Sequence, residues 1–441
     1  MVWGGNDNAV QKWIKQLQDN DPSLKTLHIL SMRRLSQSDF QSIFGALAHN
    51  TTLKELYCSG HALDIETMEQ LSEALTLNDT LESLNIGTSS LGENKQLLSI
   101  FCEGLAVNEG LRHLDLENKG LDNDAIALLA NSLIKNETLR SLNLARNNMT
   151  DEIIEKLNES IRGLERLSLA DNAIGAQGAR DLQLHQLQEL DLSNNPLMEG
   201  ASDLAAKLAE NHHLTSLKLV NITTTTSTQD EPQEDDTATT PACSEHGNAL
   251  IAQLTTAMKS NRTLTHLWVD QNGIESSAVE LKDLCKGNLI ELRMRDNKID
   301  DQGAASLAEG IMQDNNNCTL EHLDLGSNAI GYEGFGALLN TSIRHLGLFN
   351  NSVNGFPESL PGLEESGVEA LDIGCNNISI TDLEGIVTVL SQQGVPRLRL
   401  LEMGGNAKEQ DMEAWESAIA KLQEARAEIQ VAWKRFMEQQ Q

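Results

Sequence analysis

Histidine recurs at one place of a repeated phrase, once at His113 and three times in a later group of copies. His266, His322 and His345 each hold the third place of a six-residue phrase, in "LTHLWV", "LEHLDL" and "IRHLGL". An imidazole can bind a metal ion or transfer a proton. Trp268 and Arg293, in equivalent phrases, are residue types that anchor protein interfaces. Whether these residues bind a metal ion, transfer a proton or contact a protein depends on the secondary structure that positions them.

The phrase occurs fourteen times along the chain. Its copies begin at Leu24, Leu53, Leu81, Leu111, Leu139, Leu164, Leu187, Leu214, Leu264, Leu289, Leu320, Ile343, Val368 and Leu398. Most steps between copies are 23 to 31 residues long, and one step is 50 residues. A period in this range predicts structural units that stack on one another.

The apolar spacing within a copy predicts a short strand. In "LRSLNL", Leu139, Leu142 and Leu144 hold places one, four and six, which face inward, whereas places two, three, five and seven face outward. Each strand is expected to pair in parallel with the strand of the next copy. An asparagine at place nine can bond backbone groups that would otherwise be buried unpaired. Nine copies have it: Asn147, Asn172, Asn195, Asn272, Asn297, Asn328, Asn351, Asn376 and Asn406.

The first four copies lack this asparagine. They carry Met32, His61, Ser89 and Lys119 at place nine. We therefore expect the amino-terminal quarter of the repeats to be less regular than the rest.

The pattern resembles the leucine-rich repeat over residues 24–407. Apolar spacing predicts a helix over residues 149–161, and the copies of 27 to 31 residues resemble the ribonuclease-inhibitor-like class. The resemblance implies an α/β fold, a curved horseshoe-shaped solenoid of about fourteen repeats with a concave parallel sheet and convex helices. Copies of 23 residues have room for only a brief helix.

Three segments lie outside the repeats. Residues 1–23 predict a helical cap. Residues 223–247 are rich in Thr, Asp, Glu and Pro and predict a disordered insertion, either simply tolerated or a phosphorylatable or partner-ordered arm. Residues 408–441 predict an amphipathic helix over about 410–438, interrupted by Arg426. That helix either caps the last strand or, beyond Arg426, binds another helix as a coiled coil does.

The formal net charge of −32 constrains the partners. Such acidity disfavours nucleic acid and anionic membranes and favours basic partners. The six cysteines show no metal-ligand spacing, and the first residues do not resemble a signal peptide. Six of the eleven Asn-X-Ser/Thr sequons fall in the same turn before a strand, so the repeat itself generates them. These features favour a cytoplasmic protein, with nuclear or cytoskeletal association left open.

The outward places of copies nine to twelve gather the residue types of a protein interface. No catalytic motif accompanies them, so we expect a non-enzymatic scaffold or adaptor without a cofactor, which binds a protein on its concave sheet. Shielding by residues 223–247 is the alternative explanation for Trp268. A metal site is not expected, because the copy between His266 and His322 carries Glu291. The candidate partner-binding residues are His266, Trp268, Arg293, Arg295, His322, His345 and Phe349.

Ran GTPase-activating proteins share this repeat class and its acidic character, which makes GTPase activation the alternative function. In that family an arginine on an early loop assists phosphoryl transfer, and Arg33 and Arg34 are the early candidates here. The extended loop and the acidic tail of that family are both missing from this sequence.

Overall fold

The structure is a computed structural model that describes residues 6–224, 241–278, 281–313, 318–356 and 363–434. The chain divides into two compact units, Met1–Leu197 and Met198–Gln441. Each unit is an array of parallel strands backed by helices, and each is described by itself.

The first unit builds one parallel sheet from the first seven copies. Its strands pair in sequence order, and the inward leucine at place four is always opposite the leucine of the next strand, as Leu27 is opposite Leu56. The described strands are β1 Thr26–His28, β2 Glu55–Ser59, β3 Ser83–Gly87, β4 His113–Asp115, β5 Ser141–Asn143, β6 Arg166–Ser168 and β7 Glu189–Asp191.

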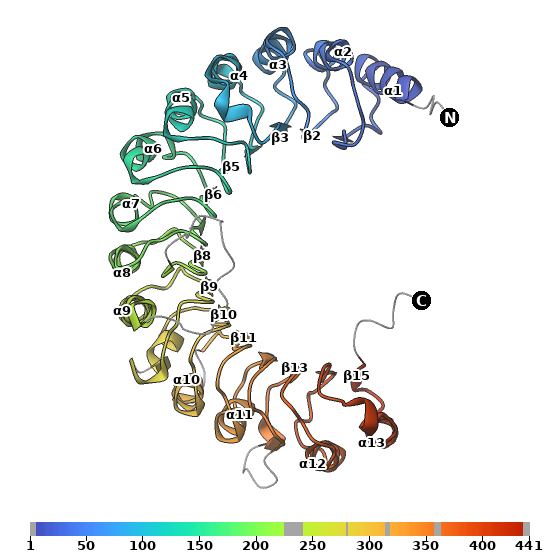
Figure 1. Cartoon of the computed structure of the whole chain (residues 1–441), viewed down its shortest axis with the longest axis vertical. Coiled ribbons are helices and arrows are strands. Elements are labelled where there is room, and N and C mark those ends of the chain that lie inside the picture. Colours follow the sequence, from blue (N-terminus) through green and yellow to red (C-terminus); the bar gives the residue numbers. More distant parts are fainter. Residues whose placement is uncertain (1–5, 225–240, 279–280, 314–317, 357–362, 435–441) are drawn as a thin grey trace. The chain divides into compact units, whose positions relative to one another are not determined.

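Helices cover one face of this sheet, and none of the helices in the described part of this unit lies on its other face (Figure 1). The inward leucines and the apolar helix faces form the core, in which Leu56, Leu84 and Phe101 are completely buried. The helices are α1 Asn6–Gln18, α2 Gln37–Leu47, α3 Ile65–Leu77, α4 Lys95–Val107, α5 Asn123–Leu133, α6 Ile154–Ser160 and α7 Ala176–Asp181, with 3-10 turns η1 Leu91–Glu93 and η2 Asp151–Ile153.

The amino-terminal helix α1 packs on α2. Val10 and Leu17 of α1 are 3% and 1% exposed. The side-chain amide of Asn50 donates to the carbonyl of Leu17 over 2.8 Å, which ties the end of α1 to the turn before β2.

The second unit repeats the design with eight described strands in parallel register. They are β8 Ser216–Lys218, β9 His266–Trp268, β10 Glu291–Arg293, β11 His322–Asp324, β12 His345–Gly347, β13 Ala370–Asp372, β14 Leu400–Glu402 and β15 Gln430–Ala432. The helices that back them are α8 Gly200–Ala206, α9 Pro241–Met258, α10 Asp301–Gln313, α11 Tyr332–Leu339, α12 Ile380–Ser391 and α13 Met412–Ala425. Five 3-10 turns complete it: η3 Lys207–Ala209, η4 Ser276–Ala278, η5 Leu281–Lys286, η6 Leu363–Glu365 and η7 Glu409–Asp411.

The asparagines at place nine join successive copies as the sequence predicts. The amide nitrogen of Asn147 donates to the carbonyl of Leu116, one copy earlier, and to that of Leu144, over 3.0 and 2.9 Å. Its oxygen accepts the backbone N–H groups of Lys119 and Leu121. One side chain thus satisfies four buried backbone groups that have no partner in the short strands.

A second asparagine ladder lies at the other end of the strands. Asn78 donates to the carbonyls of Leu47 and Asn50 over 2.7 and 2.8 Å, and its oxygen accepts the N–H groups of Thr80 and Leu81. Asn108 and Asn261, among others, repeat the arrangement one or more copies later. Several sequons before strands are therefore structural asparagines; those of Asn50, Asn78 and Asn261 are at most 4% exposed.

Strands β1 to β4 keep the register, but this quarter is less uniform than the rest, as expected: β2 and β3 have five residues instead of three, and Met32 at place nine is 83% exposed. In the second and fourth copies, a histidine and a lysine at place nine contact backbone carbonyls in place of the asparagine. A ring nitrogen of His61 lies 3.3 Å from the carbonyl of Ile29. The ammonium of Lys119 donates to Ser59 Oγ over 2.6 Å and to the carbonyl of Gly87 over 3.2 Å.

The long carboxyl-terminal helix predicted over 410–438 is also wrong. Helix α13 ends at Ala425, and Gln430–Ala432 form strand β15, which pairs with β14. Arg426 is the cause: its side chain is 1% exposed and donates to the carbonyls of Leu390, Gly394 and Pro396. Trp433, expected on a helix seam, is 8% exposed and stacks on Trp415. The projecting helix proposed for a helical partner is therefore absent from residues 426–434.

The insertion is shorter than expected, because residues 241–247 belong to helix α9. Residues 225–240, the remainder of the acidic Thr-rich segment after Thr224, lie outside the described residues.

Candidate functional site

Trp268 stands on the open face of the second unit's sheet, at place five of β9, and is only half-buried. The ammonium of Lys218 on β8 lies 4.0 Å from the ring centre, and the guanidinium of Arg293 on β10 lies 4.6 Å from it. The indole N–H donates to Glu291 over 2.8 Å. Two cations and one carboxylate therefore fix an aromatic ring that no core packing requires.

The two predicted arginines are paired within the chain rather than free. Arg293 donates to Asp270 over 2.8 Å, and Arg295 donates to Asp324 over 3.1 Å. The Asp270 side chain is 6% exposed, and it also accepts the backbone N–H of Arg295. Burial raises the pKa of Asp270, whereas the Arg295 backbone and the Arg293 charge act in the opposite direction. The arginines are thus held in fixed positions and do not form a basic patch.

The three histidines do not come together. His322 and His345, on adjacent strands, stack with ring centres 4.2 Å apart and 19° between the planes. His266 lies two strands away from His322, and a ring nitrogen of His266 is 2.8 Å from the hydroxyl of Thr265. Burial and the neighbouring His322 lower the pKa of His345. Nowhere in the described residues do three or more His, Cys, Asp or Glu side chains gather as metal ligands would.

Phe349 lies at place seven after β12 and is half-buried. A Cβ on Gly374, in the next copy, would come within 2.9 Å of the Phe349 ring. The glycine therefore makes room for the ring, which leans over β13 rather than entering the core.

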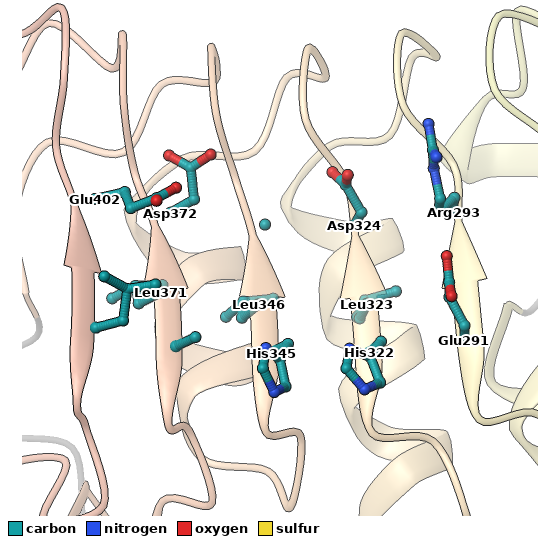
Figure 2. Close-up of a pocket in the computed structure, with 13 residues that line it drawn as sticks. Glu291, Arg293, His322, Leu323, Asp324, His345, Leu346, Leu371, Asp372 and Glu402 are labelled. Atoms are coloured by element: carbon teal, nitrogen blue, oxygen red, sulfur yellow. The ribbon is translucent and has the colours of Figure 1, made fainter. Parts of the chain in front are cut away.

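A hollow of about 390 Å³ lies beside the stacked histidines and is the main feature that the sequence did not indicate (Figure 2). It exists because each of two consecutive strands has one very small outward residue, Gly347 at place five of β12 and Ala370 at place three of β13. The residues around it are His322 and His345 on one side, Leu400 on the other, and Glu291, Arg293, Asp324, Asp372 and Glu402 as charged neighbours.

The electrostatics of the hollow are acidic. Burial raises the pKa of Asp372, and the charges of Glu402 and Asp324 add to that effect. The backbone N–H of Gly374, which Asp372 accepts over 2.9 Å, opposes the rise. A carboxylate in this setting is stabilised by an added positive charge.

Arg33 and Arg34, the two candidates for phosphoryl transfer, follow β1 in the first unit; Arg34 is exposed, and Arg33 lies beside helix α1. Its guanidinium is 5.2 Å from the centre of the Trp13 ring, and the side chain is half-buried. This contact ties Arg33 to the amino-terminal helix and gives it a structural role.

Sequence comparison agrees with the repeat design of both units. Models of the leucine-rich repeat family match residues 135–157, 163–182, 186–207, 288–308 and 316–339. This chain is a leucine-rich repeat protein. The parallel sheet backed by helices, predicted as its fold class, is confirmed in each unit, whereas the ribonuclease-inhibitor-like class stays a prediction.

Two curated leucine-rich repeat proteins are similar to parts of this one. Chicken leucine-rich repeat-containing protein 45 is 32% identical over 96 residues, which are 22% of this chain and 14% of that protein. Mouse NACHT, LRR and PYD domains-containing protein 14 is 27% identical over 374 residues, 80% of this chain and 32% of that protein. This leucine-rich repeat protein thus spans about a third or less of either relative.

Among solved structures, an internalin from Listeria monocytogenes aligns with a TM-score of 0.44 and 17% identity over 97% of this chain and 93% of that one. The leucine-rich repeat domain of APL1B aligns with a TM-score of 0.39 and 15% identity over 88% and 92% of the two chains. Within the described residues of this leucine-rich repeat protein, no helix is both long and apolar enough to span a membrane.

Proposed function

We propose that this leucine-rich repeat protein is a non-enzymatic scaffold or adaptor that binds a protein partner on the open sheet face of its second unit. The observation that carries the proposal is Trp268, a half-exposed indole held between Lys218 and Arg293. Tryptophan and arginine dominate binding energy at protein interfaces. Side chains that are already ordered lose less conformational entropy when a partner binds. The contact surface that we propose comprises His266, Trp268, Arg293, Arg295, His322, His345 and Phe349.

We also propose that the protein works in the cytoplasm. Its free thiols support this, because buried cysteines suit a reducing compartment. Cys58 and Cys102 are unpaired and buried, and burial raises the pKa of the Cys58 thiol to about 12, which makes that thiol unreactive.

Affinity purification of the full chain from its own cells, followed by mass spectrometry, tests the interaction. We expect Trp268→Ala to reduce recovery of a specific partner at least tenfold, because a central tryptophan contributes about 2 kcal/mol or more. Tyr57→Ala is the matched control, since Tyr57 is also an aromatic residue at place five but lies on β2, where it stacks on His28. Equal recovery of every partner by both variants would remove the proposed surface.

A further inference from the structure

The hollow beside the stacked histidines has a charge and a shape that indicate what enters it. We propose that it receives an arginine side chain of the protein partner, whose guanidinium stacks on the His345 ring and pairs with Asp372 and Glu402. This inference rests on the proposed function, because it assigns the chemistry of the partner to one place on the same sheet face.

Charge complementarity is the first argument. Along place five, successive strands β10 to β14 carry Arg293, Asp324, Gly347, Asp372 and Glu402. The one cation in this row, Arg293, is already bound to Asp270. Asp324 is bound to Arg295. Within the described residues, the one hydrogen bond that the Asp372 side chain accepts comes from the Gly374 backbone, and the charge of Arg295 offsets only part of the rise in its pKa. On one side of the hollow, the charge of Arg293 is already neutralised by Asp270. On the other side, Asp372 and Glu402 lie close together, and an added positive charge would stabilise both carboxylates.

The spacing of the sheet is the second argument. Gly347 lies between Asp324 and Asp372, and adjacent parallel strands are about 4.8 Å apart. A cation above Gly347 is therefore within roughly 5 Å of the carboxylates on the two adjacent strands. At that distance an opposite charge stabilises an ionised carboxylate, including one whose pKa is raised.

The flat ring beside the hollow favours arginine over lysine. His345 is exposed, and His322 covers one face of its imidazole, as Figure 2 shows. The strand on the other side carries Ala370 opposite His345, and a methyl group is too small to cover the second face. A planar guanidinium can stack on such a ring and still direct its N–H groups at carboxylates. Leu400, at place three of β14, supplies an apolar wall for the methylene groups of the same side chain.

Short peptides test the proposal without knowledge of the partner. The probes are acetyl-Gly-Arg-Gly-amide, its lysine analogue and its citrulline analogue, which is neutral but close to arginine in shape. They are titrated at millimolar concentration into the full chain labelled with ¹³C at histidine Cε1, and NMR follows the resonances of His322 and His345. We expect the arginine peptide to shift both resonances, with an affinity about fivefold or more above that of either analogue.

Two variants separate a specific site from general attraction to an acidic protein. Asp372→Asn is expected to weaken the arginine peptide at least fivefold. Asp191→Asn removes the same charge from place five of β7, where the carboxylate likewise accepts a backbone N–H two residues ahead, and is expected to change nothing. Equal weakening by both variants would overturn the site.

Ala370→Leu fills the hollow without changing its charge, and a leucine is compatible with this place because Leu400 holds it on the next strand. We expect this variant to abolish the histidine shifts. Shifts that persist in Ala370→Leu, or an equal response to the lysine peptide, would contradict the proposed arginine site. Because the readout needs no partner, loss of the peptide effect leaves the Trp268 test intact. Conversely, a partner insensitive to Trp268→Ala leaves the peptide result standing.

Discussion

Asp270 and Asp372 lie on the same sheet face, but the charges that act most strongly on the two carboxylates have opposite signs. Burial raises the pKa of both carboxyl groups. Asp270 has Arg293 as an ion-pair partner at 2.8 Å, whereas Asp372 faces Glu402 and Asp324. The first carboxylate stabilises the array that holds Trp268, and the second is kept in an unfavourable charged state that a ligand can relieve.

The raised pKa of Asp372 predicts that its charge reduces the stability of the fold. Its folded-state pKa lies above the ordinary value of 3.8, so the penalty is complete above the folded pKa and disappears below 3.8. Asp372→Asn should therefore increase the free energy of unfolding at pH 7, and the increase should shrink as the pH falls towards 4. Urea denaturation across that range measures it, with Asp191→Asn as the control. A gain that grows towards acid pH would contradict this assignment.

The hydrogen-bonding asparagines belong to the scale of elements, because each joins the turn of one copy to the turn of the next. Strands of three residues offer few backbone bonds of their own, so side-chain amides satisfy the groups at both ends of the strands. The same requirement explains why so many sequons are buried.

Asn78→Ala should cost about 2–3 kcal/mol, because it leaves buried backbone groups on two neighbouring copies without partners. Urea denaturation of the full chain provides the measurement. Asn131→Ala, at an exposed place on α5, is the control and should stay within about 0.5 kcal/mol of wild type. If both variants unfold at the wild-type urea concentration, the second ladder has no energetic role.

Arg426 is a buried charged residue between the end of helix α13 and strand β15. Arg426→Ala should destabilise the last copies by about 3 kcal/mol, because the carbonyls of Leu390, Gly394 and Pro396 lose their donor. Hydrogen exchange should accelerate in α12, α13 and β15 and remain unchanged in α2 and α3. Arg426→Lys keeps the charge but cannot reach three carbonyls in the same fixed geometry, so it should rescue the loss only in part. Wild-type protection of β15 in the alanine variant would contradict this role.

The spacing of apolar residues predicted most of the strands and helices, and the elements that it did not predict have identifiable physical causes. Places one, four and six identified the inward faces, and the 23-residue copies do have brief helices, α7 and α11. Strand β15 was missed because its phrase, "EIQVAW", has a glutamate in the first place and a tryptophan in the sixth. Helical spacing around Arg426 suggested one helix, since periodicity does not show that an arginine can be buried among carbonyls.

The sequence predicted only those parts of the candidate site that have a large or charged side chain at an outward place. Trp268 was identified because an outward tryptophan has no core function, but its two cation neighbours depend on the strand register. The hollow was not predicted because it results from missing side chains, at a glycine and an alanine, whereas the predicted site was built from reactive or bulky ones. Small residues at outward places of adjacent copies, Gly347 and Ala370, were the available signal.

At the scale of the whole molecule, the dominant quantity is the net charge of −32. Like charges distributed over a stacked array repel one another in the folded state more than in the expanded unfolded chain. Ion pairs such as Lys54–Glu82, at 2.6 Å, offset the repulsion locally, but exposed pairs contribute only about 0–1 kcal/mol each.

Salt should therefore stabilise the protein. Raising NaCl from 20 to 300 mM should increase the unfolding free energy by on the order of 1 kcal/mol, because screening reduces the net repulsion more than it weakens the ion pairs. Urea denaturation at both salt concentrations gives the answer, and KCl should act in the same way as NaCl. A lower urea midpoint in salt would show that the ion pairs outweigh the repulsion.

Repeat proteins are commonly trimmed at the boundary between copies, since each copy depends on its immediate neighbours. Lys119 is an exception in the first unit, because its ammonium reaches Ser59, 60 residues earlier, and the carbonyl of Gly87. A chain cut just after Ser59 would keep the fourth copy but remove one of the groups that solvate its buried cation. Transplanting the fourth copy together with the second and third would therefore preserve both hydrogen bonds of this ammonium group.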